Sequence, residues 1–114
     1  LTGRMKDFYD IYYLSRTFDF EGAKLQAAIF ETLQRRGTPY DRDSFKRVVA
    51  LADDEDMQKR WKFFLKTIKD NTLEISFVIA EIQTFLEPVF DAIVNEKEIS
   101  QRWNCNNVKW NGGY

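Results

Sequence analysis

Apolar residues recur along this chain at the three- and four-residue spacing of α-helices, whereas the strict alternation typical of a half-buried strand never persists. The segment from residue 57 to 68 has the clearest pattern, because its apolar positions fall on one helical face. They are Met57, Trp61, Phe64, Leu65 and Ile68. Such a stripe is typical of a helix that packs one side against a core. The hydrophobic pattern therefore predicts an all-α fold.

Two helices are predicted at the start of the chain, from about residue 4 to 15 and from about residue 21 to 36. Asp19 precedes the second helix, and its carboxylate could accept the free backbone N–H groups of the first turn. Gly37 follows this helix and suits the left-handed conformation in which many helices end. We therefore expect Asp19 to cap the second helix and Gly37 to terminate it.

Three more helices are predicted in the second half of the chain. A short one is expected to open at Asp43 or Ser44. The acidic run 53–56 is expected at the N-terminus of the next helix, where the helix dipole favours negative charge. The last helix, from about residue 75 to 95, contains Pro88, which has no backbone N–H to donate. We expect a kink or a break at this proline.

Residues 1–99 are thus predicted to form a single bundle of about four to five helices joined by short turns. Residues 100–114 are rich in Asn and Gly, and their aromatic residues, which include Trp103 and Trp110, follow no period. This segment is predicted to be an irregular tail that its tryptophans hold against the bundle. A chain of 114 residues is long enough to close one compact core.

The charges of the chain nearly cancel, with 17 basic and 18 acidic residues, so no overall field would draw it onto nucleic acid or membranes. Histidine is absent, which excludes Ser-His-Asp and Cys-His catalysis and His-ligated metal sites within this chain. The single cysteine, Cys105, has no disulfide partner and no adjacent cation to lower its pKa. A cytoplasmic protein is therefore expected, and no membrane partner, because no apolar run approaches the roughly 20 residues that cross a bilayer.

The densest group of charges lies in residues 4–10, where Arg4 and Lys6 accompany Asp7 and Asp10. The two carboxylates could share a divalent cation or hold a lysine in place, and the two cations could bind phosphate oxygens. The simpler interpretation is that Arg4 pairs with Asp7 and Lys6 with Asp10, each pair contributing only about 0.2–0.5 kcal/mol. Aromatic residues interleave with these charges, which indicates that they are partly buried.

Residues 4–14, which read Arg-Met-Lys-Asp-Phe-Tyr-Asp-Ile-Tyr-Tyr-Leu, resemble the third motif of the AbiEii/AbiGii toxin family. In that motif a basic residue and an Asp are followed by a second Asp and then by Leu. The similarity continues through residues 18–22 and 35–39, and less tightly through Trp61 and residues 64–65. It covers about the first 65 residues well, and the remainder only as helical character.

That family is similar to minimal nucleotidyltransferases, in which an N-terminal α/β half carries a Gly-Ser motif and an Asp-x-Asp metal motif and a helical C-terminal half closes the cleft. This chain resembles only the helical half. It begins at Leu1, and it has no Gly-Ser pair, no strand-borne Asp-x-Asp motif and no family lysine upstream of the third motif. The resemblance implies a fragment of a nucleotidyltransferase toxin of a type IV toxin–antitoxin or abortive-infection system, inactive by itself.

The resemblance also implies roles for four residues. Asp7 and Asp10 would be catalytic residues that order cations in the cleft, while Lys6 and Arg4 would bind the nucleotide. The intact parent protein would use Mg²⁺ and a nucleoside triphosphate, and this chain alone is expected to hold no cofactor. Expected partners are the missing N-terminal half, a cognate antitoxin, and a tRNA or protein acceptor. A second copy of the chain, bound through the exposed docking face as a homodimer, is a further candidate partner.

Two other charged groups have simpler explanations. Asp53, Asp54 and Asp56 compete for the position of a later family aspartate, and none is assigned, because a helix cap explains the cluster. A basic strip follows one side of the predicted helix around Trp61 and is expected to be a solvated face. Its members are Lys59, Arg60, Lys62, Lys66 and Lys69.

The alternative function is a non-catalytic helical module that binds a protein partner. The cleft hypothesis predicts that Asp7 and Asp10 lie half-buried at an open surface, beside an apolar patch where the other half of the enzyme would dock. A fully polar surface, with both carboxylates in bulk water, would weaken the cleft hypothesis, whereas the module should keep its partner after Asp7→Ala and Asp10→Ala.

Overall fold

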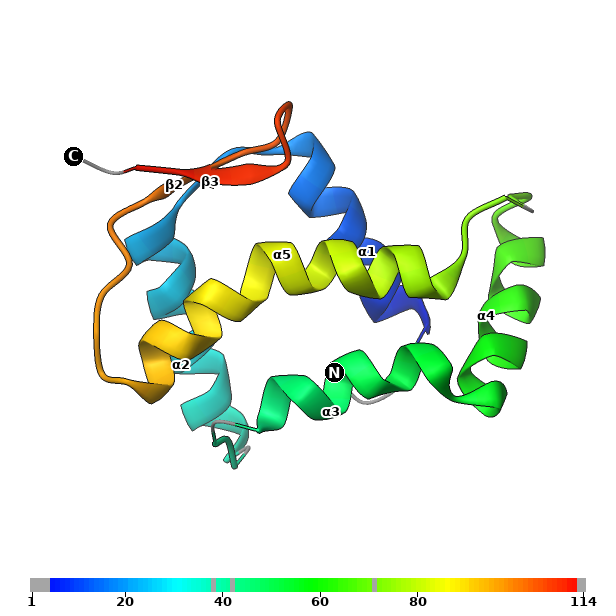
Figure 1. The fold of residues 1–114 in the computed structure, drawn as a ribbon, viewed down its shortest axis with the longest axis horizontal. Coiled ribbons are helices and arrows are strands. Elements are labelled where there is room, and N and C mark those ends of the chain that lie inside the picture. The colour runs from blue at the N-terminus through cyan, green and yellow to red at the C-terminus, as the bar shows by residue number, and fades with distance from the viewer. Residues whose placement is uncertain (1–4, 38, 42, 71, 113–114) are drawn as a thin grey trace.

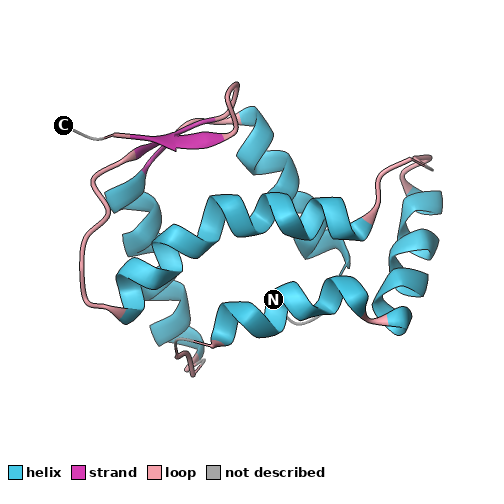
Figure 2. Cartoon of the chain, in the orientation of Figure 1, coloured by secondary structure: helices cyan, strands magenta, loops and turns pink. Residues whose placement is uncertain are grey.

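The computed structural model describes residues 5–37, 39–41, 43–70 and 72–112. Within those ranges, five α-helices accompany a small antiparallel sheet of three strands (Figures 1 and 2). The elements in chain order are α1 (Met5–Thr17), β1 (Phe20–Glu21), α2 (Gly22–Arg36), α3 (Ser44–Ala50), the 3-10 helix η1 (Leu51–Asp53), α4 (Glu55–Thr67), α5 (Ile75–Val94), β2 (Arg102–Asn104) and β3 (Lys109–Asn111). The predicted helical fold is confirmed, but the stricter prediction of an all-α chain is wrong.

Helix α5 is the centre of the fold. It crosses the middle of the molecule, and α1, α2, α3, η1 and β3 all contact it (Figure 1). Its first half joins residues of α1, α3 and α4 in the main core, and its second half joins the segment before β2 in a smaller cluster. The main core consists of Phe8, Phe45, Met57, Trp61, Leu65, Ile75, Val78, Ile79 and Ile82, and the smaller one of Val89, Ile93 and Ile99. Burial of this apolar surface is the main force that holds the helices together.

Pro88 lies inside α5 without ending it. Its ring removes one backbone hydrogen-bond donor, and Figure 1 shows that the helix bends along its length. The neighbouring Phe85 and Val89 are both buried, so packing on either side of the proline holds the two halves in one helix. The expected kink agrees with this bend, whereas a break at Pro88 does not occur.

Residues 100–112 are not the irregular tail that the sequence predicted. Strands β2 and β3 form an antiparallel hairpin with Trp103 opposite Trp110, and β1 pairs with the other edge of β2. Strands of three residues or fewer are too short to show an alternating pattern, so periodicity could not reveal them. The predicted role of the tryptophans is confirmed. The indole N–H of Trp103 donates to the Ser15 carbonyl at 2.6 Å, and that of Trp110 to the Phe85 carbonyl at 3.0 Å.

The chain comes very close to itself where α2 begins. The backbone N–H of Gly22 donates to the carbonyl of Gln101 at 2.8 Å, and a Cβ at Gly22 would lie 2.5 Å from that oxygen. Asp19 does not cap α2 as predicted, because Glu21 occupies the N-cap position. The carboxylate of Asp19 instead accepts the backbone N–H of Cys105 at 2.9 Å. Pairing of β1 with β2 extends the backbone here and carries Asp19 toward the hairpin.

Two other predicted helix boundaries are confirmed. Gly37 ends α2 in the left-handed conformation, with φ of 61°, and its N–H donates to the carbonyl of Gln34. The side chain of Asp54 accepts the backbone N–H of Met57 at 3.1 Å. The acidic run therefore does begin a helix, and Asp54 is its cap.

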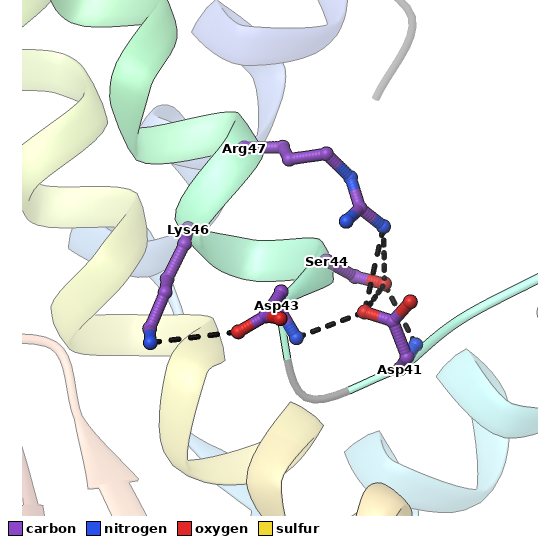
Figure 3. Close-up of polar contacts among 5 residues, drawn as sticks. All are labelled: Asp41, Asp43, Ser44, Lys46 and Arg47. Atoms are coloured by element: carbon purple, nitrogen blue, oxygen red, sulfur yellow. Dashed lines mark hydrogen bonds and ion pairs between the residues drawn. The ribbon is translucent and has the colours of Figure 1, made fainter.

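Helix α3 begins at Ser44, as predicted, behind a turn that Asp41 stabilises (Figure 3). The Asp41 carboxylate accepts the backbone N–H of Asp43 at 2.8 Å, and the Ser44 hydroxyl accepts the backbone N–H of Asp41 at 2.8 Å. The Arg47 guanidinium lies 3.5 Å from the same carboxylate. The Asp43 N–H has the largest effect in lowering the pKa of Asp41, and the charge of Arg47 and a hydrogen bond donated by the Ser44 hydroxyl at 3.3 Å add to it. This cluster is fully explained by its role in starting α3.

The contact between the hairpin and α1 can be tested by replacing Trp103 with Ala. We expect the free energy of unfolding to fall by about 3–5 kcal/mol, because the change empties a fully buried site and leaves the Ser15 carbonyl without its donor. Urea denaturation followed by circular dichroism measures the difference. Phe63→Ala is the control, since Phe63 is 71% exposed and should change stability by no more than about 0.5 kcal/mol. Equal stability of the Trp103→Ala variant and the original chain would refute this account.

Candidate functional site

Helix α1 carries the charged motif on its outer side and aromatic residues on its inner side. Phe8 is fully buried, and Tyr9 and Tyr12 pack against the main core. Lys6 and Asp10 lie one turn apart on the outer side, where Nζ of Lys6 is 2.8 Å from the Asp10 carboxylate. Their side chains are 69% and 49% exposed. The ion pair predicted between these two residues is confirmed.

Asp7 lies on the same helix, and both Asp7 and Asp10 are half-buried. Arg4 falls outside the described residues, so its predicted pair with Asp7 and its nucleotide contact remain predictions. Among the residues that the structure describes, no group of three or more His, Cys, Asp or Glu side chains could hold a metal ion. Mg²⁺ prefers about six oxygen ligands, so Asp7 and Asp10 could supply only part of a Mg²⁺ site.

A groove between α1 and α4 opens beside Lys6. It has a volume of about 610 Å³, and Met5 and Lys6 line its α1 side. The α4 side consists of Lys59, Arg60, Phe63, Phe64 and Thr67. The ring of Phe64 packs 5.7 Å from the ring of Tyr9, which links the two helices. Every charged residue in this lining is a cation.

All five cations of the basic strip predicted on α4 are exposed, so the predicted solvated face is confirmed. Lys59 and Arg60 line the groove with Lys6, whereas Lys62 lines a different depression near the start of α5. Sequence reasoning missed Phe63, which is 71% exposed at the groove. A signal for it was present, because a large apolar residue between Lys62 and Lys66 interrupts the polar side of α4.

The C-terminal part of α1 is fastened to α5. Arg16 lies 3.1 Å from the Glu81 carboxylate, and its guanidinium stacks 5.1 Å from the ring of Tyr12 and 5.4 Å from that of Phe77. A guanidinium between two rings and a carboxylate has little freedom to move. These contacts set the direction of α1, and so the side on which Lys6 and Asp10 are presented.

Beyond Asp10, the exposed part of α1 becomes apolar. Tyr13 is 53% exposed, Leu14 41%, and Phe18, just after the helix, 51%. Half-buried carboxylates at an open surface, followed by exposed apolar residues, agree with the geometry that the cleft hypothesis predicts. The surface is not the fully polar one that would weaken that hypothesis.

The cysteine is held by hydrogen bonds at the hairpin. The Asp19 carboxylate accepts hydrogen bonds from the thiol and from the backbone N–H of Cys105. The thiol hydrogen bond raises the pKa of Cys105 most, and burial and repulsion by the Asp19 charge raise it further. The same contacts lower the pKa of Asp19, the backbone N–H of Cys105 having the largest effect. A thiol with a raised pKa is a poor nucleophile at neutral pH, so the expectation of no nucleophilic role is consistent with this environment.

Comparison with known families identifies the chain. Residues 1–96 match the family model described as "Nucleotidyl transferase AbiEii toxin, Type IV TA system". The chain belongs to the AbiEii family. The match includes α1 to α5 and so extends well beyond the residues that carried the resemblance in the sequence. Searches of curated proteins and of solved structures found no match.

Two further points concern the AbiEii chain as a whole. The strands β2 and β3 lie after the last matched residue, so the hairpin that fastens α1 is not covered by the family match.

In the part of the chain that the structure describes, none of the helices combines the length and apolar character needed to span a bilayer.

The contact between Asp19 and Cys105 predicts how the thiol titrates in this AbiEii chain. Replacing Asp19 with Ala removes the acceptor and the negative charge that raise the thiol pKa, so the thiolate should form at lower pH. The rate at which iodoacetamide alkylates Cys105, measured as a function of pH, gives the pH at which half of the thiol is ionised. A change in how easily the reagent reaches the thiol alters the rate at every pH but not this midpoint. Asp70→Ala, at a carboxylate with a lowered pKa in another turn, should leave the midpoint unchanged. An unchanged midpoint in Asp19→Ala would contradict the assignment.

Proposed function

We propose that this chain forms the helical wall of a nucleotidyltransferase cleft, and that an α/β half of the parent protein forms the other wall. Membership of the AbiEii family supports the reaction class. The observation that carries the proposal is the position of Lys6 and Asp10. Both belong to the family-like third motif, and they are paired and exposed on a helix whose inner side is fixed in the core.

Lys6 would neutralise phosphate charge on a bound nucleoside triphosphate, and Asp10 would position Lys6. An ammonium group held by a carboxylate 2.8 Å away is already oriented, so less freedom is lost when a phosphate binds. Asp7 and Asp10 would be the catalytic carboxylates at the edge of the cleft, and Arg4 would add a second phosphate contact. Mg²⁺, when bound, neutralises phosphate charge and orients the phosphates for in-line attack. Because two carboxylates do not complete its coordination, most Mg²⁺ ligands would come from the other half.

The exposed apolar residues after Asp10 indicate where the proposed α/β half would dock. Tyr13 and Leu14 lie on the helix that carries the proposed cleft residues, and Phe18 follows it directly. An α/β half that covers them would also approach Lys6 and Asp10. Without that half, the same surface could pair two copies of the chain, which sedimentation would detect as a homodimer.

The alternative proposal is a non-catalytic helical module that binds a partner such as a cognate antitoxin. The exposed apolar residues on α1 favour it as much as they favour docking of an α/β half. The two proposals predict different sequences encoded before Leu1 in the gene. A Gly-Ser motif and an Asp-x-Asp motif encoded before Leu1 would support the transferase, and their absence there would support the module. The acceptor of the transferred nucleotide, tRNA or protein, belongs to the first proposal only.

The proposed role of Lys6 is tested in the parent protein extended before Leu1. Lys6→Ala should reduce incorporation of labelled nucleotide into cellular RNA or protein by about 100-fold, because a preorganised cation aimed at phosphate charge is lost. Lys24→Ala is a matched control, since Lys24 is also an exposed lysine that pairs within one turn, at 3.3 Å from Glu21. The control should keep full activity. Full activity of Lys6→Ala, or no incorporation by the unmodified parent, would sink the proposal.

A further inference from the structure

The groove between α1 and α4 gathers cations from two helices that lie far apart in the sequence. We infer that this groove binds the polyphosphate of the nucleoside triphosphate, and that Lys59 and Arg60 of α4 are phosphate-binding residues alongside Lys6. The inference rests on the proposed function and extends its phosphate contacts to residues outside the third motif. The groove has a volume of about 610 Å³ and is open to solvent, so a ligand can enter it directly.

The charges of the groove favour an anion. Lys6, Lys59 and Arg60 all line it, and its lining contains no acidic residue. Lys6 is paired with Asp10, and Arg60 lies 2.9 Å from Asp56, but both pairs are exposed and join residues one turn apart. Exposed pairs of this kind are weak, so phosphate oxygens can bind the same cations beside the carboxylates.

Lys59 is the cation most available to a ligand. Its side chain makes no ion pair among the described residues, while neighbouring Arg60 does. Among the described residues, a phosphate in the groove would therefore bind Lys59 without displacing an ion pair. Arg60 would add a planar group that can donate two parallel hydrogen bonds to phosphate oxygens.

The aromatic residues of the groove favour a nucleotide over a simple anion. Phe63 is 71% exposed, an unusual position for a phenyl ring on the polar side of a helix. The adjacent Phe64 is held between the rings of Tyr9, at 5.7 Å, and Trp61, at 5.5 Å, and makes the α4 side rigid. A rigid helix with an exposed ring offers a surface on which a nucleobase can stack while its phosphates contact the cations.

The phosphate contact is tested on the 114-residue chain by titration with inorganic triphosphate at low ionic strength, followed by calorimetry. The double variant Lys59→Ala/Arg60→Ala should weaken binding by about 10-fold or more, because two charged hydrogen-bond donors are lost. Lys62→Ala/Lys66→Ala removes the same charge from the same helix but outside the groove, and should weaken binding by less than about 3-fold. Equal weakening by both pairs, or no binding by the unmodified chain, overturns the inference.

The base contact is tested with Phe63→Ala. This variant should bind a nucleoside triphosphate about 10-fold more weakly than the unmodified chain does, yet bind inorganic triphosphate equally well. Weaker binding of both ligands would show that Phe63 acts through the fold rather than on the base, and would overturn this part. Failure of the groove is distinguishable from failure of the proposed function. If the parent protein transfers nucleotide and needs Lys6 but not Lys59 and Arg60, the proposed function stands and the inference about the groove is wrong.

Discussion

The indole N–H of Trp103 donates a hydrogen bond to the carbonyl of Ser15, and both residues are buried. The bond joins positions 88 residues apart. Since a buried carbonyl without a donor is costly, the end of α1 and the β2–β3 hairpin are stable only together. Together with the contacts of Arg16, this bond sets the direction of α1, which decides that α1 presents Lys6 to the groove beside α4. The exposed charged pair near the start of the chain thus depends on a contact made near its end.

The parts of the fold that could be predicted are those held by contacts between residues close together in the sequence. Helices α1 to α5 could be placed because each buries a stripe of its own sequence, and Gly37 and Asp54 mark ends through bonds within a few residues. Strands β2 and β3 could not, because three-residue strands carry no readable period. Asp19 was assigned to the wrong partner for a similar reason. Its local geometry suits a helix cap, but a distant hairpin provides the competing donor.

The candidate site divides in the same way. The pair of Lys6 and Asp10 could be predicted because both residues lie on one helix at a spacing of four. The groove could not, because it exists only where α1 packs against α4 and brings Lys6 to Lys59 and Arg60. The α4 cations are exposed, as the sequence predicted. Only the packing shows that two of them share a concave surface with the charged motif.

The order of elements along the chain has a consequence for synthesis. In the described residues the five α-helices precede β2 and β3, so the ribosome releases the proposed cleft wall before the hairpin that fastens it. Until Trp103 emerges, the carbonyl of Ser15 lacks its buried donor, and α1 lacks one of the contacts that set its direction. The direction of α1 is therefore fixed only after the ribosome has synthesised the hairpin, which follows α1 by more than 80 residues.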